Sequence, residues 1–183
     1  MKHTSNLLQR FLGSTSGVGT VEFAVTVPIL LILYLGGVDL TRAVTFSHKL
    51  QNATTAVNDL VSQSTSLTKA DVQKTFDAAD VMLARYRTSL INIRVTTVRI
   101  DTAGVAKVQW SVARGMERLG ANSNYKLSPH LERLRDYTLV ITETKHDFLP
   151  IMTYVFKTSF DLSAQAQGRF RGRDPVFCKD CTS

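Results

Sequence analysis

Cysteine and aromatic residues are scarce in this chain of 183 residues, which has two cysteines and 8% Phe, Trp and Tyr. Two cysteines exclude a disulfide-rich scaffold, and the low aromatic content predicts a mostly aliphatic core. No repeat with a period of roughly 20 to 50 residues is visible, which excludes a solenoid. With 44% hydrophobic and 20% charged residues, the chain is neither disordered nor collagen-like, and its length suits one modest domain with one appended element.

Motifs for catalysis and metal binding are also missing. The sequence has no HExxH, no G-x-S-x-G and no G-x-x-x-x-G-K-[ST]. The histidines are scattered without ligand spacing, and we interpret each as a surface side chain: His3, His48, His130 and His146. Three acids on an expected helix are interpreted as its solvated face: Asp71, Asp77 and Asp80. We therefore expect no enzymatic activity, no cofactor and no metal.

Acidic residues are outnumbered, with 15 Asp and Glu against 22 Lys and Arg and a net charge of +7. A basic balance favours anionic partners such as a membrane surface or nucleic acid. Arg169, Arg171 and Arg173 would share one face of a strand. That face is either a solvated edge that blocks aggregation or a docking patch for another subunit or an anionic surface. No aromatic platform accompanies the arginines, so we do not expect nucleic-acid binding.

One long stretch near the N-terminus has no charge at all. Residues 23–38 read FAVTVPILLILYLGGV, and a helix that starts at Val18 would span about 31 Å, close to the ~30 Å hydrocarbon core of a bilayer. A buried core helix is a poor alternative, because the stretch is apolar all round. A secretory signal cut after residue 38 is a more serious alternative, but Asp39-Leu-Thr-Arg-Ala43 is a poor cleavage site. We favour a membrane-spanning helix over residues 18–38.

The flanks of this span indicate its orientation. Lys2, Arg10 and the free amine precede it without any acid, whereas Arg42 and Lys49 after it are partly offset by Asp39. The positive-inside rule therefore favours a cytoplasmic N-terminus and an exported C-terminal domain.

Glu22 lies at the N-terminal end of the apolar stretch, five residues after Gly17. A carboxylate costs on the order of 2.5–3.5 kcal/mol at the bilayer centre, less near the interface, where the helix dipole favours it. A basic, Ser/Thr-rich leader that ends in glycine, followed by this glutamate, resembles the class III signal of type IV pilin-like proteins. The resemblance implies that a membrane peptidase cuts between Gly17 and Val18, and that Glu22 neutralises the new amine of Val18.

The resemblance extends to one subfamily. Glu22-Phe-Ala, Pro28 with its Leu/Ile run, and Asp39-Leu-Thr-Arg42 resemble the TadE-like minor pseudopilins of tight-adherence (Flp) pilus systems. Weaker similarity follows in three later segments: Val108–Ser111, Leu139–Pro150 and Arg169–Arg173. The related TadF group shares the N-terminal pattern and stays an alternative, whereas TadG proteins usually carry a much larger exported domain.

The periodicity of the chain predicts an α+β fold. We expect one helix from Val18 to Val61, with a kink or weak point at Pro28 and at Gly36-Gly37. After a polar break at 62–67, a capping box at Thr68 begins a second helix that reaches about Arg85. Alternating β-branched residues predict four strands: 91–101, 105–113, 137–148 and 160–170. A short helical turn is predicted at 130–135. The predicted architecture is a long helix laid against an antiparallel sheet, as in pilin-like folds.

Cys178 and Cys181 form a C-x-x-C pair near the C-terminus. Redox activity would need a thioredoxin-like frame, and a zinc site would need two more ligands, neither of which is evident. In an oxidising exported compartment a disulfide is the simplest state of the pair.

Together these patterns predict a class III leader (1–17), a transmembrane helix (18–38), a helical extension and linker (39–67) and an exported α+β domain (68–183). The resemblance implies a structural protein of the bacterial inner membrane that is cut by a prepilin peptidase. Its expected partners are that peptidase, other pseudopilins, pilus-platform membrane proteins and the membrane itself. The alternative is an uncut, single-pass membrane protein with an exported binding domain.

Overall fold

The structure is a computed structural model that describes residues 16–85, 90–151, 159–170 and 177–181. A long helix α2 (Ser16–Gln63) is followed by a short strand β1 (Ser66–Leu67) and a second helix α3 (Lys69–Leu83). Four longer strands follow, and a two-residue strand ends the described chain: β2 (Asn92–Ile100), β3 (Ala106–Arg114), β4 (Tyr137–Phe148), β5 (Phe160–Arg169) and β6 (Phe177–Cys178). The predicted α+β class is confirmed.

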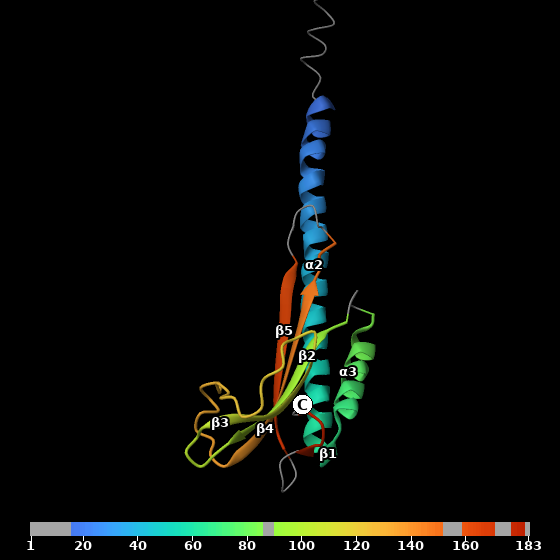
Figure 1. The fold of residues 1–183 in the computed structure, drawn as a ribbon. Helices are drawn as coiled ribbons and strands as arrows, with labels where there is room; N and C mark the ends of the chain where they lie inside the picture. Colours follow the sequence, from blue (N-terminus) through green and yellow to red (C-terminus); the bar gives the residue numbers. More distant parts are fainter. Residues whose placement is uncertain (1–15, 86–89, 152–158, 171–176, 182–183) are drawn as a thin grey trace, which may run out of the picture.

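Helix α2 has 48 residues and passes through Pro28 and Gly36-Gly37 without interruption. At ~1.5 Å per residue it is about 72 Å long. Its first part projects away from the rest of the molecule, and its second part lies along the sheet and α3 (Figure 1). The single helix predicted from Val18 to Val61 is therefore confirmed to within two residues at each end.

The four longer strands form one antiparallel sheet in the order β3-β2-β4-β5. All four strands were predicted, and the bounds of β4 agree with the prediction at both ends. One face of the sheet packs on α2 and α3 and contains Ile93, Val95 and Trp110. The opposite face has its own apolar cluster, centred on Ile100 and Ile141.

Residues between β3 and β4 cover this second face. Tyr125, Leu127, Leu131 and Leu134 pack against the cluster. Backbone hydrogen bonds from Tyr125 and Asn122 to β3 hold the segment on the sheet. The irregular composition of 115–129 therefore produces a layer without helix or strand that still buries apolar side chains.

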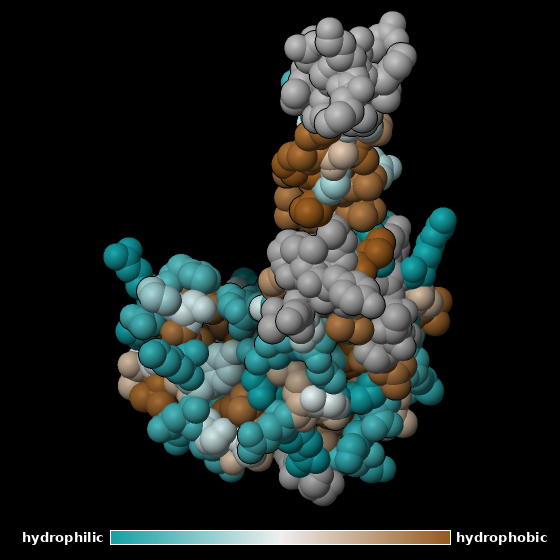
Figure 2. Space-filling view, turned by 90° about the horizontal axis from the view of Figure 1, so that it is seen from above, coloured by the Kyte–Doolittle hydropathy of each residue, from teal (hydrophilic) through white to brown (hydrophobic). Residues whose placement is uncertain are grey.

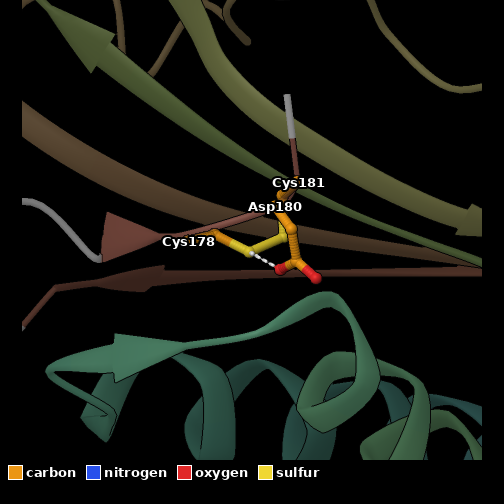
Figure 3. Close-up of side chains that lie close together, drawn as sticks. All are labelled: Cys178, Asp180 and Cys181. Carbon is orange, nitrogen blue, oxygen red and sulfur yellow. Dashed lines mark hydrogen bonds between the residues drawn. A yellow bond between two sulfur atoms is a disulfide. The ribbon is translucent and has the colours of Figure 1, made fainter. Parts of the chain in front are cut away.

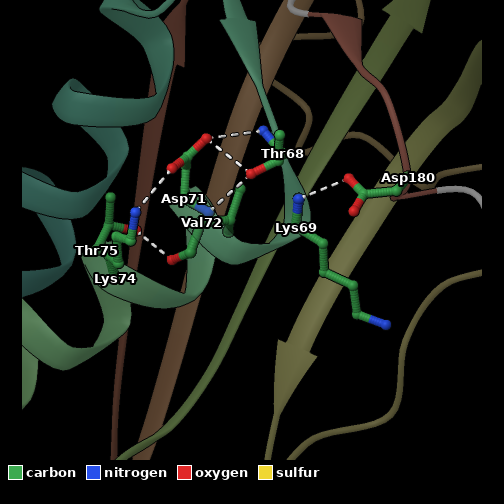
Figure 4. Close-up of polar contacts among 7 residues, drawn as sticks. All are labelled: Thr68, Lys69, Asp71, Val72, Lys74, Thr75 and Asp180. Carbon is green, nitrogen blue, oxygen red and sulfur yellow. Dashed lines mark hydrogen bonds and ion pairs between the residues drawn. The ribbon is translucent and has the colours of Figure 1, made fainter.

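A capping box begins α3, as predicted. The Thr68 hydroxyl accepts a hydrogen bond from the backbone N–H of Asp71 at 3.2 Å, and the Asp71 carboxylate accepts one from the N–H of Thr68 at 3.2 Å (Figure 4). The hydrogen bond from the Thr68 side chain lowers the pKa of Asp71 below its ordinary value of 3.8. Asp71 therefore stays ionised and satisfies free N–H groups at the helix start.

Two sequence interpretations are wrong. Asp80 is buried: it accepts a hydrogen bond from the backbone N–H of Ile91 and pairs with Arg114, because the C-terminal half of α3 lies against the sheet. His146 is also buried, with its ring 4.9 Å from that of Phe46. Position on a helix or strand alone does not reveal which face a neighbouring element covers.

Candidate functional site

The projecting part of α2 presents apolar side chains on all sides. Nine large apolar residues between positions 21 and 34 are 51–69% exposed: Val21, Phe23, Val25, Ile29, Leu30, Leu31, Ile32, Leu33 and Tyr34. The brown, hydrophobic atoms of this projection are visible in Figure 2. By length and composition α2 is able to cross a membrane, and its most apolar window is not buried within the molecule. A helix of this kind serves as a membrane anchor or a signal.

The predicted cleavage site lies at the first turn of this helix. Because α2 begins at Ser16, the Gly17–Val18 peptide bond belongs to its N-terminal end. Val18 and Glu22 are four residues apart and therefore lie on one face of the helix. A Cβ atom built on Gly17 would meet nothing within 4 Å, so the described fold itself does not require glycine at this position.

Asp39 marks the point where α2 meets the sheet. This residue is 5% exposed, and its carboxylate accepts a hydrogen bond from the backbone N–H of Ile151 at 2.8 Å. Arg42 lies one turn further, with its guanidinium 3.4 Å from the Asp39 carboxylate and 5.8 Å from the ring centroid of Phe148. In the sequence, Asp39 stood out as a flanking acid and as part of the Asp39-Leu-Thr-Arg42 motif, and neither observation predicted its hydrogen bond to Ile151.

Further along α2, the contact with the sheet is polar. Thr54 and Thr144 share a hydrogen bond of 2.7 Å between their hydroxyls. With its amide nitrogen directed toward β4, Asn58 donates to Val140 O at 2.9 Å and accepts from the N–H of Gly168 at 3.0 Å. A buried side chain that bonds two fixed backbone groups, and also the Thr142 hydroxyl at 3.1 Å, sets the register of the helix on the sheet.

The C-terminus is attached to the start of α3. Cys178 and Cys181 are joined by a disulfide, and both are buried (Figure 3). Asp180, between them, accepts a hydrogen bond from the backbone N–H of Lys69 at 2.8 Å (Figure 4). β6 pairs in parallel with β1. The three side chains of Cys178, Asp180 and Cys181 lie close together, but the sulfurs are bonded to each other and offer no thiolate to a metal.

Only part of the predicted basic patch is described. Arg169 is exposed at the end of β5, and its guanidinium lies 4.9 Å from the ring centroid of Tyr137. Arg171 and Arg173 lie outside the described residues, as do the leader residues 1–15. The predicted docking patch therefore stays a prediction.

These features define a class of protein. A long apolar helix that continues into a domain, and there packs on an antiparallel sheet with a second helix, is a pilin-like arrangement.

Comparison with known families gives a narrower assignment for the N-terminal region. Residues 17–57 match the family model of the TadE-like proteins. The match begins at the predicted cleavage glycine and ends within the buried part of α2, so this region of the chain is similar to the TadE-like proteins. No curated protein and no solved structure matches the chain.

Proposed function

We propose that the chain is a minor pseudopilin of a tight-adherence pilus assembly or secretion machine. A prepilin peptidase cuts it between Gly17 and Val18. The mature protein stays in the inner membrane with its N-terminus in the cytoplasm and its sheet domain exported. There it packs helix to helix with other pseudopilins and with membrane proteins of the pilus platform. Its role is structural, in pilus initiation or assembly, and it is a substrate of an enzyme rather than an enzyme.

One observation carries this proposal: a single helix is exposed and apolar in its first part and buried against a domain in its second part. The family match from residue 17 supports it, since the matched region includes Gly17, Glu22 and the whole span. A signal removed after residue 38 would cut α2 in mid-helix, directly before Asp39, which bonds the sheet domain.

Sequencing the mature N-terminus separates the candidate functions. A start at Val18 supports the proposal. A start at Met1 supports the alternative of an uncut membrane protein with an exported binding domain. A start just after residue 38 supports conventional secretion.

The identity of residue 17 tests the cleavage directly. A peptidase site that closes around a small residue should reject a large one, so Gly17→Arg should leave a precursor that is larger by the 17-residue leader. Gly17→Ala is the matched control and should still be cut, because alanine is small and the described fold leaves room for its Cβ. A mature-sized band from the arginine variant, seen by immunoblot, would refute a class III signal.

Glu22 tests the assembly step separately. Its proposed partner, the amine of Val18, exists only after cleavage and lies one helical turn away. Glu22→Gln should therefore give a mature-length, membrane-held protein that no longer co-isolates with other pseudopilins and supports no pili. Glu22→Asp shortens the side chain by one methylene and should give a partial defect. Normal pili from the glutamine variant would show that the charge pair is not needed.

A further inference from the structure

The end of the sheet nearest the projecting helix carries exposed apolar side chains. Leu149 and Ile151, directly after β4, are 57% and 59% exposed, and Phe160 at the start of β5 is 45% exposed. Phe148 and Phe160 are register partners, so these residues lie at one end of the β4–β5 pair. We call Leu149, Ile151 and Phe160 the sheet tip.

The sheet tip lies level with the end of the uncharged part of α2. The backbone N–H of Ile151 donates to the Asp39 carboxylate at 2.8 Å, and Asp39 is the first residue after the uncharged stretch. Leu35, the last large apolar side chain of the exposed run, is one turn or about 6 Å before Asp39. Figure 1 shows the end of β4 and the start of β5 beside α2. If residues 18–38 lie in a bilayer, the tip lies at its boundary with water.

The charges around the tip are suited to such a boundary. Asp39 is 5% exposed, pairs with Arg42 and accepts a hydrogen bond from the N–H of Ile151. Asp147 and Asp161 are exposed register partners that lie one position further from the tip than Phe148 and Phe160, on its water side. The Arg42 side chain is 47% exposed although its guanidinium pairs with Asp39 and lies over the Phe148 ring, so part of this side chain stays accessible to lipid phosphates. On the adjacent turn, Leu40 is also exposed and extends the apolar surface of α2 beyond Asp39.

We propose that the sheet tip is a second membrane contact, inserted into the interface of the same bilayer that α2 crosses. The inference rests on the membrane anchoring in the proposed function and goes beyond it. Apolar side chains joined to a membrane span favour transfer into the headgroup and acyl boundary. Two contacts, one along α2 and one at the tip, fix the tilt and rotation of the exported domain relative to the membrane surface. A single helix anchor would leave both free.

Tryptophan quenching by lipid tests the contact. The full chain is placed in phosphatidylcholine nanodiscs with brominated acyl chains, and tryptophan is introduced at Ile151 or, in a second variant, at Leu149. The native chain has one tryptophan, Trp110, which is buried in the core and serves as the common background. Leu30→Trp marks the span, and Val81→Trp, on the exposed face of α3, marks the domain surface away from the tip.

We expect the added emission at position 151 or 149 to fall roughly twofold in brominated lipid, because interfacial side chains lie ~5–10 Å into the headgroup and acyl boundary. Emission at position 30 should fall further, and emission at position 81 should not change.

Quenching at position 30 without quenching at positions 151 and 149 would overturn the contact between the sheet tip and lipid and would leave the membrane anchoring intact. No quenching at 30 would overturn the anchoring and, with it, the tip contact. A blue shift at 151 that grows with protein density, without bromine quenching, would assign the tip to a second copy of the chain and overturn its contact with lipid.

Discussion

Asn58 shows how one side chain determines where the long helix rests. It bonds the carbonyl of Val140 and the N–H of Gly168 on a buried face of α2 that also carries apolar side chains of the core. A shift of α2 along the sheet would leave these buried groups without partners, and each unsatisfied group costs ~1–3 kcal/mol. Gly168 lies so close that a side chain there would occupy the position of the amide.

Substitution of Gly168 tests this contact. A Cβ atom at this position would lie 2.3 Å from the Asn58 amide, so Gly168→Ala must displace the amide and break its hydrogen bonds. We expect a loss of about 1–3 kcal/mol in the free energy of unfolding, the usual cost of overpacking. The control is Gly120→Ala, where a Cβ atom meets nothing within 4 Å. Chemical denaturation of the full chain in detergent measures the stability of both variants. Equal denaturation midpoints for Gly168→Ala and Gly120→Ala would contradict the prediction.

Two neighbouring acids of α3 differ in burial, so substitution of each should lower the free energy of unfolding by a different amount. Asp80 is buried and pairs with Arg114, whereas the side chain of Asp77 is 71% exposed and pairs with the same arginine at 2.9 Å. Asp80→Asn should lower the free energy of unfolding by about 1.5–3 kcal/mol, the usual contribution of a hydrogen bond to a charged group. Asp77→Asn should cost at most about 1 kcal/mol, because exposed ion pairs contribute little. Similar thermal midpoints for the two variants would reject this ranking.

At the scale of the element, the start of α3 gives a pH dependence of known sign. The hydrogen bond from the Thr68 side chain, and then that from its backbone, lower the pKa of Asp71 in the folded chain. A lowered folded-state pKa means that the stabilisation is fully present above the unfolded value, near 3.8, and is lost as pH falls through the folded value.

The difference in unfolding free energy between the native chain and Asp71→Asn should therefore be constant above about pH 5 and shrink below pH 3.8. Thr68→Val removes the hydroxyl that contributes most to the shift and should weaken the pH dependence without removing the carboxylate. Urea unfolding at a series of pH values measures both. A difference that grows as the solution is acidified would have the wrong sign.

The longer elements were predictable because their periodicity extends over many residues, whereas the shorter features were not. α2, α3 and β2 to β5 all follow from spacing and β-branched content. In β3, however, Ala106 and Trp110 have the same parity but belong to clusters on opposite faces, because the pairing shifts between Thr97 and Val98 of β2 and leaves Gln109 as an extra residue. Simple alternation does not reveal a bulge.

Features that depend on tertiary contacts were also missed. The β1–β6 pair joins two segments of two residues each that are about a hundred positions apart, too short to give a pattern. Of the candidate site, the positions of Gly17, Glu22 and the apolar span were visible in the sequence. The contact between Asp39 and Ile151 depends on where β4 ends in space, and no local pattern contains that information.

At the scale of the whole molecule, the sheet domain does not begin at the end of α2. Phe46, Leu50, Val57 and Val61 are fully buried and form one cluster with the sheet. The second part of α2 is therefore part of the domain core, and only the part before Asp39 is separable from it.

Truncation tests this division. A fragment of residues 39–183 keeps every buried residue of α2, including Asp39, and should fold in water without detergent. A fragment of residues 64–183 loses the helix that covers the sheet and should not fold. Near-ultraviolet circular dichroism of Trp110, which lies in the core cluster, and cooperative thermal melting distinguish the two outcomes. A folded shorter fragment would show that the sheet and α3 suffice.

The continuity of α2 has a mechanical consequence. No loop or hinge interrupts the described helix between the bilayer-length part and Asn58, and hydrogen bonds along a helix axis resist compression. An axial displacement of the apolar first part of α2 therefore moves the sheet with it. A movement of one helical turn, about 5.4 Å, would shift the sheet domain by the same distance. Under the proposed membrane anchoring, α2 would act as a stiff rod that carries motion within the bilayer to the folded domain outside it.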